Sequence, residues 1–332
     1  MARGHKGLPR PAPRVMTKPA LLSGLRAVDS SPNATRRILA METEFRRRMA
    51  SHIGSLPAED AKLAKFNTSP FVLMIHCLHR GYKRVSQIEA DILPAKQFSS
   101  METSAGRMVE VVAMPHYGWD SVPSEMHSAN SALDGKRLVG NTLFLATLKS
   151  GPRCLNDEMS ENLADSIIGH CTAWAADAGV KTLDFTYGVL YGTPQQSNKK
   201  DWHILRNLKE KLPARSMAVR PENRWDCRFA KGGIDVTVSV RIGADWWRHL
   251  GGDTGLVEIC VALIRACVAP DGEIDQPDYV YAISDLSEIV SLATVPTDFN
   301  VSILQRSQLP WLFFLARHFC DELTDAASAI SA

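Results

Sequence analysis

The chain has 332 residues, of which 45% are hydrophobic and 22% charged, a composition typical of a globular protein with a sizeable core. Its 38 basic residues nearly balance its 36 acidic residues, so the net charge of +2 neither indicates nor excludes a nucleic-acid partner. No run approaches the roughly 20 apolar residues of a membrane span, and the basic, proline-rich start lacks the apolar segment of a secretory signal. We therefore expect no membrane partner.

The seven cysteines are scattered, and no two of them form a C-x-x-C pair. Their odd number and irregular spacing predict free thiols in a reducing cytoplasm and not a disulfide framework. The cluster His76-Cys77-Leu78-His79 has no second ligand pair at zinc spacing, so we do not predict a zinc site there.

The first third of the chain is expected to be a tail followed by helices. Residues 1–32 are basic and rich in proline, which predicts a disordered tail. Residues 33–96 form the predicted helical segment, in which the last helix stops before Pro94 because a residue that precedes proline disfavours the helical conformation. The expected helices are Asn33–Met49, Pro57–Arg84 and Gln87–Leu93.

A further helix is predicted to start at the serine pair before Met101 and to reach Glu110. Its residues Glu102, Gly106 and Glu110 are four apart, so they share one helix face. The small Gly106 between the two carboxylates would let another element approach closely.

The remainder alternates between strands and helices, which predicts an α/β fold with a central mixed sheet flanked by helices. A hairpin around Val139-Gly140-Asn141 and an N-cap at Asn156 are the clearest local signals. Further along the chain, residues 192–233 form a basic, weakly periodic insertion. Strands are expected at Ala132–Leu138, Thr142–Lys149, Thr182–Tyr191 and Asp235–Ile242, and helices at 156–177, Asp245–Leu250, Gly255–Val268 and Trp311–Leu323.

Candidate catalytic residues gather around the predicted hairpin. Strand alternation puts Thr147 and Lys149 on one face at the strand's end, and Asp134 lies one hairpin strand away. Hydrolysis of a phosphodiester with Mg²⁺ needs hard oxygen ligands for the metal and a cation near the attacking water. Both residues also have purely structural interpretations. Asp134 could be a turn residue because it precedes a glycine, and Lys149 could be a solvated lysine because it ends its strand.

Four short blocks in this order resemble type II restriction endonucleases of the PD-(D/E)xK superfamily. They are the helix Ser-Ser-Met-Glu-Thr-Ser-Ala-Gly-Arg-Met-Val-Glu at 99–110, Leu-Lys-Ser-Gly-Pro at 148–152 with Asn156 following, Tyr-Gly-Val-Leu-Tyr-Gly at 187–192, and Ile-Gly-Ala-Asp-Trp-Trp at 242–247. The resemblance covers about residues 97–265 and implies a restriction-endonuclease-like nuclease domain over 97–332. We expect the aromatic residues of these blocks to belong to the core or the sheet edge and not to stack on bases.

By this resemblance Asp134 is the catalytic aspartate, Lys149 the catalytic lysine, and the Leu148 carbonyl a further ligand of Mg²⁺. The chain departs from the family at Thr147, where Glu or Asp is usual. A glutamate from a helix would then complete the metal site, and we favour Glu110. The other candidates are Glu102, Glu158 and Glu161.

The resemblance implies a site-specific deoxyribonuclease that acts on double-stranded DNA as a homodimer in the bacterial cytoplasm, with a cognate DNA methyltransferase. A DNA cutter must neutralise phosphates, so we expect contacts from the basic insertion. The candidate residues are Lys199, Lys200, Arg206, Lys209, Arg220 and Arg224. Two alternatives stay open: a repair or recombination nuclease of the same fold, and a DNA-binding protein that does not cut because Thr147 replaces the acid.

Overall fold

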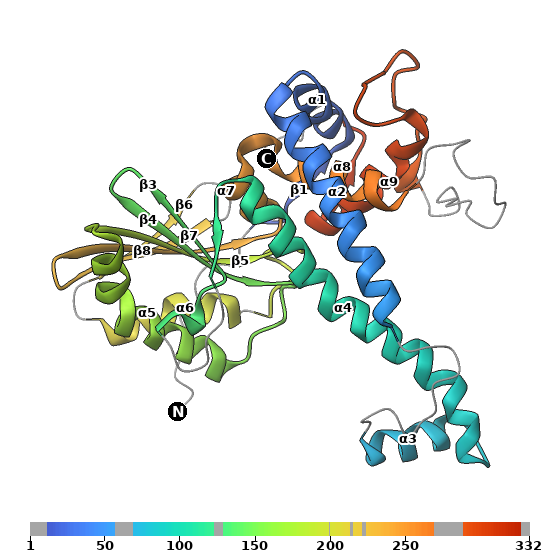
Figure 1. The fold of residues 1–332 in the computed structure, drawn as a ribbon, viewed down its shortest axis with the longest axis horizontal. Coiled ribbons are helices and arrows are strands. Elements are labelled where there is room, and N and C mark those ends of the chain that lie inside the picture. The colour runs from blue at the N-terminus through green and yellow to red at the C-terminus, as the bar shows by residue number, and fades with distance from the viewer. Residues whose placement is uncertain are drawn as a thin grey trace.

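The computed structural model describes residues 12–56, 69–122, 129–198, 200–212, 215–220, 224–268 and 288–326. A mixed sheet of seven strands, in the order β2-β3-β4-β5-β8-β7-β6, forms the centre of the fold (Figure 1). This confirms the predicted α/β class. The strands are β2 (Asp120–Ser121), β3 (Gly135–Val139), β4 (Thr142–Lys149), β5 (Thr182–Val189), β6 (Arg215–Arg220), β7 (Arg224–Lys231) and β8 (Ile234–Ile242).

The three central strands are parallel, and antiparallel strands flank them on both sides. The second halves of β4 and β5 and most of the second half of β8 are buried because helices cover both faces of the sheet there. Their register aligns Lys149 with Val189 and Val189 with Ile242, so the carboxyl ends of all three strands meet at one edge.

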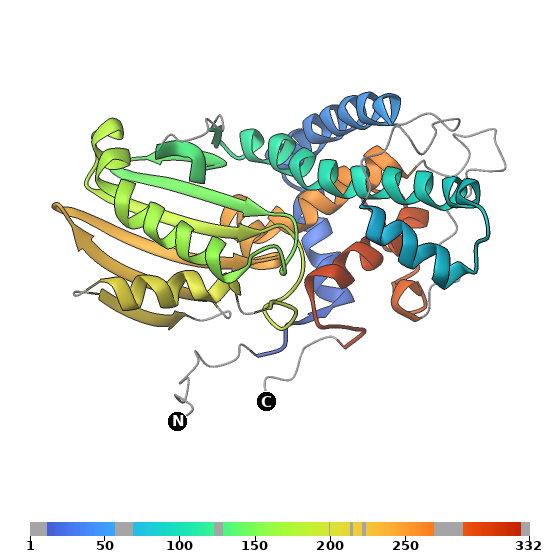
Figure 2. The same cartoon turned by 90° about the horizontal axis from the view of Figure 1, so that it is seen from below.

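Two helical layers cover the sheet. Helices α5 (Asp157–Ala178) and α6 (Lys200–Lys211) pack on one face, where Leu143 and Leu145 of β4 join their apolar cluster (Figure 2). The other face packs against the end of α4 (Glu89–His116), α7 (Ala244–Gly251) and α8 (Gly255–Cys267), and there Ala146 and Leu148 join the second cluster. The predicted N-cap is present, since the Asn156 side chain accepts a hydrogen bond from Met159 N.

The expectation of a tail over residues 1–32 is wrong for its second half. Residues 15–29 form β1 (Val15–Thr17) and α1 (Lys18–Asp29), and β1 pairs in parallel with β9 (Glu322–Thr324) near the other end of the chain. Helix α1 buries Leu21, Leu25 and Val28 against the same cluster as α8, and this apolar stripe outweighs the basic, proline-rich composition of its neighbours.

The long helix α4 corrects a second expectation. It continues through Pro94 to His116, so the serine pair at 99–100 starts no new helix. Pro94 removes one hydrogen bond, to Ala90, and both residues lie on an exposed surface where water can satisfy the carbonyl. The other helices of this region are α2 (Pro32–Ser55) and α3 (Pro70–Arg80).

The described residues of the basic stretch 192–233 include α6 and two strands of the main sheet, β6 and β7. The last helix, α9 (Leu309–Ala316), starts and ends earlier than expected.

All seven cysteines are free thiols, as predicted. Among the described residues no helix has the length and apolarity to span a membrane. Short 3-10 helices are η2 (Val85–Ile88), η3 (Ala129–Ala132), η5 (Gly252–Thr254), η7 (Glu288–Val290), η8 (Arg306–Gln308) and η9 (Arg317–Phe319).

Candidate active site at the end of strand β4

Asp134 lies where strand β4 extends beyond its antiparallel partner. Strand β3 begins at Gly135, opposite Ala146, so the last residues of β4 have no β3 residue beside them. Asp134 fills this place: its N–H donates to the Ala146 carbonyl at 2.8 Å, and its Oδ2 accepts from the Leu148 N–H at 2.6 Å. Burial raises the pKa of Asp134, and the Leu148 N–H and the charge of Lys149 oppose that rise.

The Leu148 carbonyl points to the same side of β4 as Asp134. In an extended strand the N–H and C=O of one residue point to one side, and the next residue points to the other. The Lys149 carbonyl accepts from Leu190 N at 2.9 Å and therefore faces β5. The Leu148 N–H faces Asp134, so the Leu148 carbonyl does as well.

Glu110 of α4 brings a second carboxylate to this site. It is half-buried, and its pKa is raised to about 7, first by burial and then by the negative charge of Asp134. The positive charges of Lys149 and Arg107 act in the opposite direction. The structure therefore brings Glu110, Asp134 and Lys149 together, from a helix, a loop and a strand that are far apart in sequence.

Gly106 explains how α4 comes so near the sheet. A Cβ built on Gly106 would lie 2.8 Å from the Cβ of Ser150, closer than real Cβ atoms approach. Only glycine therefore permits this crossing, which places Glu110 one turn further along the helix, beside the end of β4. The expected close approach at Gly106 is confirmed.

A cavity of about 490 Å³ adjoins this crossing. Glu102 contributes to its wall from α4, and Tyr191 contributes from the segment after β5. Tyr191 is half exposed, whereas Tyr187, Trp246 and Trp247 are buried, as expected of core aromatics.

Thr147 has a role in positioning. Its buried hydroxyl donates to the carbonyl of Ala132, two residues before Asp134, and so holds the segment that carries the aspartate. Of the remaining candidate glutamates, Glu158 is exposed in the first turn of α5, and Glu161 pairs with Lys211 at 3.0 Å.

The basic residues of α6 are largely engaged with acidic partners. Lys200 pairs with Asp157 at 2.5 Å, and Arg206 lies 3.9 Å from Glu210 on its own helix. Lys209 is exposed, but it lies nine residues from Lys200, about 13 Å along the helix axis. Lys199 lies outside the described residues.

The backbone positions of Arg220 and Arg224 lie near the candidate active site, at the same edge of the sheet. They pair with each other where β6 and β7 join, and Trp225 pairs with Val240 near the end of β8. Since β8 ends level with Lys149, these two backbone positions lie at the same edge of the sheet as the carboxylates. Four strand spacings separate β4 from β6, which is about 19 Å.

Arg107 is a site residue that the sequence interpretation missed. It is exposed and lies three residues before Glu110, and its charge lowers the pKa of that carboxyl. The spacing of Arg107 and Glu110 could have indicated this contact, because residues three apart are neighbours on a helix surface.

The donor set fits a magnesium ion. Mg²⁺ is usually bound through one or two carboxylates and keeps several waters, and Asp134, Glu110 and the Leu148 carbonyl provide hard oxygen atoms. Burial raises the pKa of both carboxyls, and the negative charge of Asp134 adds to the rise at Glu110. Within the described ranges, no group of three or more His, Cys, Asp or Glu residues could hold a metal, so backbone and water oxygens would have to complete the shell.

Comparison with protein-family models and with curated proteins gives no match to this chain. The resemblance to type II restriction endonucleases therefore rests on the four sequence blocks.

Proposed function

We propose that this protein is a magnesium-dependent, site-specific endonuclease that cleaves double-stranded DNA. The observation that carries the proposal is the meeting of Glu110 with Asp134 and Lys149 at the end of β4. Two carboxylates and one lysine are the groups that metal-assisted phosphodiester hydrolysis needs, and Glu110 makes up for the acid that Thr147 does not supply.

Each residue has a defined task in this reaction. A bound Mg²⁺ would polarise the scissile phosphate and lower the pKa of a coordinated water. Asp134 and Glu110 would hold the ion, with the Leu148 carbonyl beside them. The Lys149 ammonium would orient the attacking water and stabilise the negative charge that develops on the phosphate. Water adds to phosphorus, one P–O ester bond breaks, and the water's proton ends on the leaving oxygen.

The charge state of Glu110 sets a pH requirement. With a pKa of about 7, the metal-free carboxyl is half protonated near neutral pH. Metal ligands must be deprotonated, so binding of Mg²⁺ would release this proton and would strengthen as the pH rises through about 7.

Arg220 and Arg224, at the β6–β7 junction, support the proposal that DNA binds across this edge of the sheet. The backbone of Arg224 on β7 lies three strand spacings or about 14 Å from β4, and that of Arg220 on β6 lies about 19 Å from it, so one duplex could span these positions and the catalytic groups together. A homodimer would place one site on each strand of a palindromic target, and a cognate methyltransferase would protect the same sequence in the host.

Digestion of a long phage DNA tests the proposal. The expected result is a set of discrete fragments with Mg²⁺ and none with EDTA. A smear would favour a nuclease that recognises structure, and binding without cutting would favour the non-cleaving alternative. Either result contradicts the proposed function.

A further inference from the structure

A cavity separates helix α3 from helix α4. Its volume is about 420 Å³, and it is lined by residues of both helices and by Ser69, the N-cap of α3. Within α3, which the structure describes in full, no residue is buried, so the pairing of the two helices leaves this space unfilled. Voids much larger than a water molecule are uncommon between packed elements, whereas ligand pockets have volumes of about 300–1,000 Å³. The cavity therefore has the size of a binding site for a small molecule.

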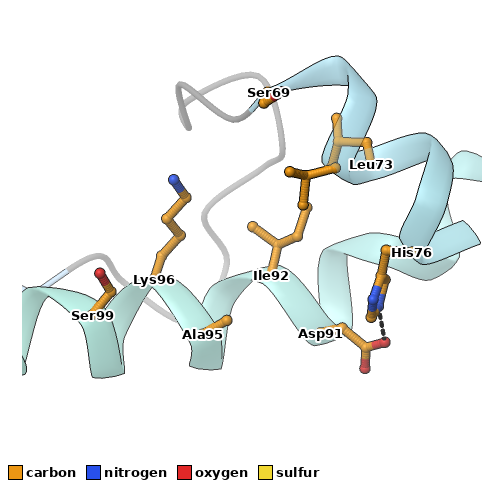
Figure 3. A pocket seen from close by; sticks show the side chains of 9 residues that line it. Ser69, Leu73, His76, Asp91, Ile92, Ala95, Lys96 and Ser99 are labelled. Carbon is orange, nitrogen blue, oxygen red and sulfur yellow. Dashed lines mark hydrogen bonds and ion pairs between the residues drawn. The ribbon is translucent and has the colours of Figure 1, made fainter. Parts of the chain in front are cut away.

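The middle of the cavity is apolar. Leu73 of α3 and Ile92 of α4 point toward each other across it (Figure 3). Val72 and Ala95 extend these walls along the two helices. Val72 is 57% exposed, so a ligand between the helices would remove apolar surface from water. The middle of the cavity thus favours a ligand with an apolar body.

The carboxylate at one end of the cavity already has partners within the chain. Asp91 Oδ2 lies 2.8 Å from His76 Nε2 and 3.5 Å from Arg80 Nε. The same oxygen accepts a hydrogen bond from the Tyr82 hydroxyl at 2.6 Å. These contacts lower the pKa of Asp91, first through Tyr82 and then through His76, so the carboxyl stays ionised with its charge compensated. A cationic ligand would therefore gain little at this end.

The other end of the cavity carries a cation. Lys96 follows Asp91 by five residues, about 7.5 Å along the axis of α4. Its half-buried side chain rises from α4 toward the level of α3, and Ser69 and Ser99 lie on the same side of Leu73 and Ile92 as Lys96 (Figure 3). Among the described residues that line the cavity, Lys96 is the one with a permanent positive charge. An ammonium group and two hydroxyls are donors that suit an anionic group.

We propose that this cavity binds a small amphiphilic anion, a molecule with an apolar body and one carboxylate or similar anionic group. The body would lie between Leu73 and Ile92, and the anionic group would contact Lys96. A cavity of about 150 Å³ holds one benzene molecule, so 420 Å³ corresponds to a ligand of roughly 15 non-hydrogen atoms. A medium-chain fatty acid has this size and this chemistry.

Such a ligand would connect the two helices. Leu73 belongs to α3, whereas Ile92 and Lys96 belong to α4, so one bound molecule would contact both. Binding would add apolar contacts to the polar attachment at Asp91. The inference does not depend on the proposed function, because no DNA contact and no residue of the candidate active site enters it.

Isothermal titration calorimetry of the full chain, without DNA, tests the inference. The probes are octanoate, which is anionic, and octanol, which has the same carbon chain without the charge. The wild type should bind octanoate about tenfold more tightly than octanol, because a hydrogen bond that involves two charged groups is stronger than one to a neutral group. Lys96→Gln should remove this preference by weakening octanoate alone.

The variant Ala95→Trp tests the cavity itself. Ala95 is exposed and lines the cavity, so the indole would occupy the space without disturbing the core, and binding of both probes should be lost. Lys136→Gln, at an exposed position on β3 outside the cavity, is the matched control and should bind both probes like the wild type. All three variants should keep the circular dichroism spectrum of the wild type.

A wild type that binds neither probe, or both equally, would overturn the inference. An unchanged preference in Lys96→Gln, or binding that survives Ala95→Trp, would also overturn it. Co-sedimentation of the wild type with anionic phospholipid vesicles, abolished by Lys96→Gln, would assign the site to a membrane surface and contradict the proposed free ligand. Because none of these measurements uses DNA cleavage, the inference and the proposed function fail separately.

Discussion

The substitution Glu110→Gln should stabilise the metal-free protein even though it removes a proposed metal ligand. The pKa of Glu110 is about 7 in the folded protein, against an ordinary value of 4.5. The folded state therefore resists ionisation of this carboxyl, and that resistance lowers the free energy of unfolding once the pH exceeds the unfolded pKa. Glutamine does not ionise, so the free energy of unfolding of the variant does not fall in this way as the pH rises.

The size of the effect follows from the shift in pKa. Each pKa unit corresponds to about 1.4 kcal/mol, so the shift of Glu110 costs about 3 kcal/mol at about pH 8 and less than about 1 kcal/mol at about pH 5. The penalty is absent below the unfolded pKa, grows as the pH rises, and levels off above the folded pKa.

Urea unfolding of the metal-free protein at these two pH values measures this difference. Glu110→Gln should exceed the wild type in stability by about 3 kcal/mol at the higher pH and by much less at the lower pH. Glu102→Gln, at an exposed position on the same helix face, is the matched control and should differ from the wild type by less than about 0.5 kcal/mol. A Glu110→Gln variant that is less stable at both pH values would refute the reasoning.

Further predictions concern the lysine, the helix crossing and the DNA surface. Lys149→Ala should lower the single-turnover cleavage rate at least about a hundredfold while DNA binding stays within a few-fold, and normal cleavage would remove the lysine from the mechanism. Gly106→Ala should lower the free energy of unfolding by about 1–3 kcal/mol in a urea titration, since its Cβ meets the end of β4, whereas Gly169→Ala on α5, with nothing within 4 Å, should be neutral or stabilising. Replacing Arg220 and Arg224 with Gln should reduce the slope of log affinity against log salt by about 1.8, and an unchanged slope would place the DNA surface elsewhere.

Local patterns in the sequence predicted four of the seven strands, β3, β4, β5 and β8, but missed β2, β6 and β7. Strand β4 and helix α5 lie within a residue of their expected bounds, because alternation, the hairpin turn and the Asn156 cap all act over a few residues. The tail and α4 were predicted wrongly for the opposite reason. Whether residues 18–29 form a helix depends on packing against distant α8, and the effect of Pro94 depends on how exposed its helix is.

The candidate site was predictable in its residue types but not in its charge state. The face shared by Glu102, Gly106 and Glu110 pointed to a close helix crossing, and Gly106 confirms it. The sequence favoured Glu110 over Glu102, but the burial and the neighbouring charge of Asp134 that raise its pKa depend on the tertiary structure. The ion pair of Lys200 with Asp157 could not be predicted from the sequence either, since the two residues are 43 positions apart.

The central claim is that Glu110 and Asp134 together hold the metal for DNA cleavage, and the cleavage rate of Glu110→Gln tests it most directly. Single-turnover cleavage of a duplex should be measured at millimolar Mg²⁺ and about pH 8, where the wild-type carboxyl ionises. We predict that Glu110→Gln loses at least about a hundredfold in rate, while Glu102→Gln cuts like the wild type and both still bind DNA. Normal cleavage by Glu110→Gln, or a loss of rate in Glu102→Gln alone, would contradict the account.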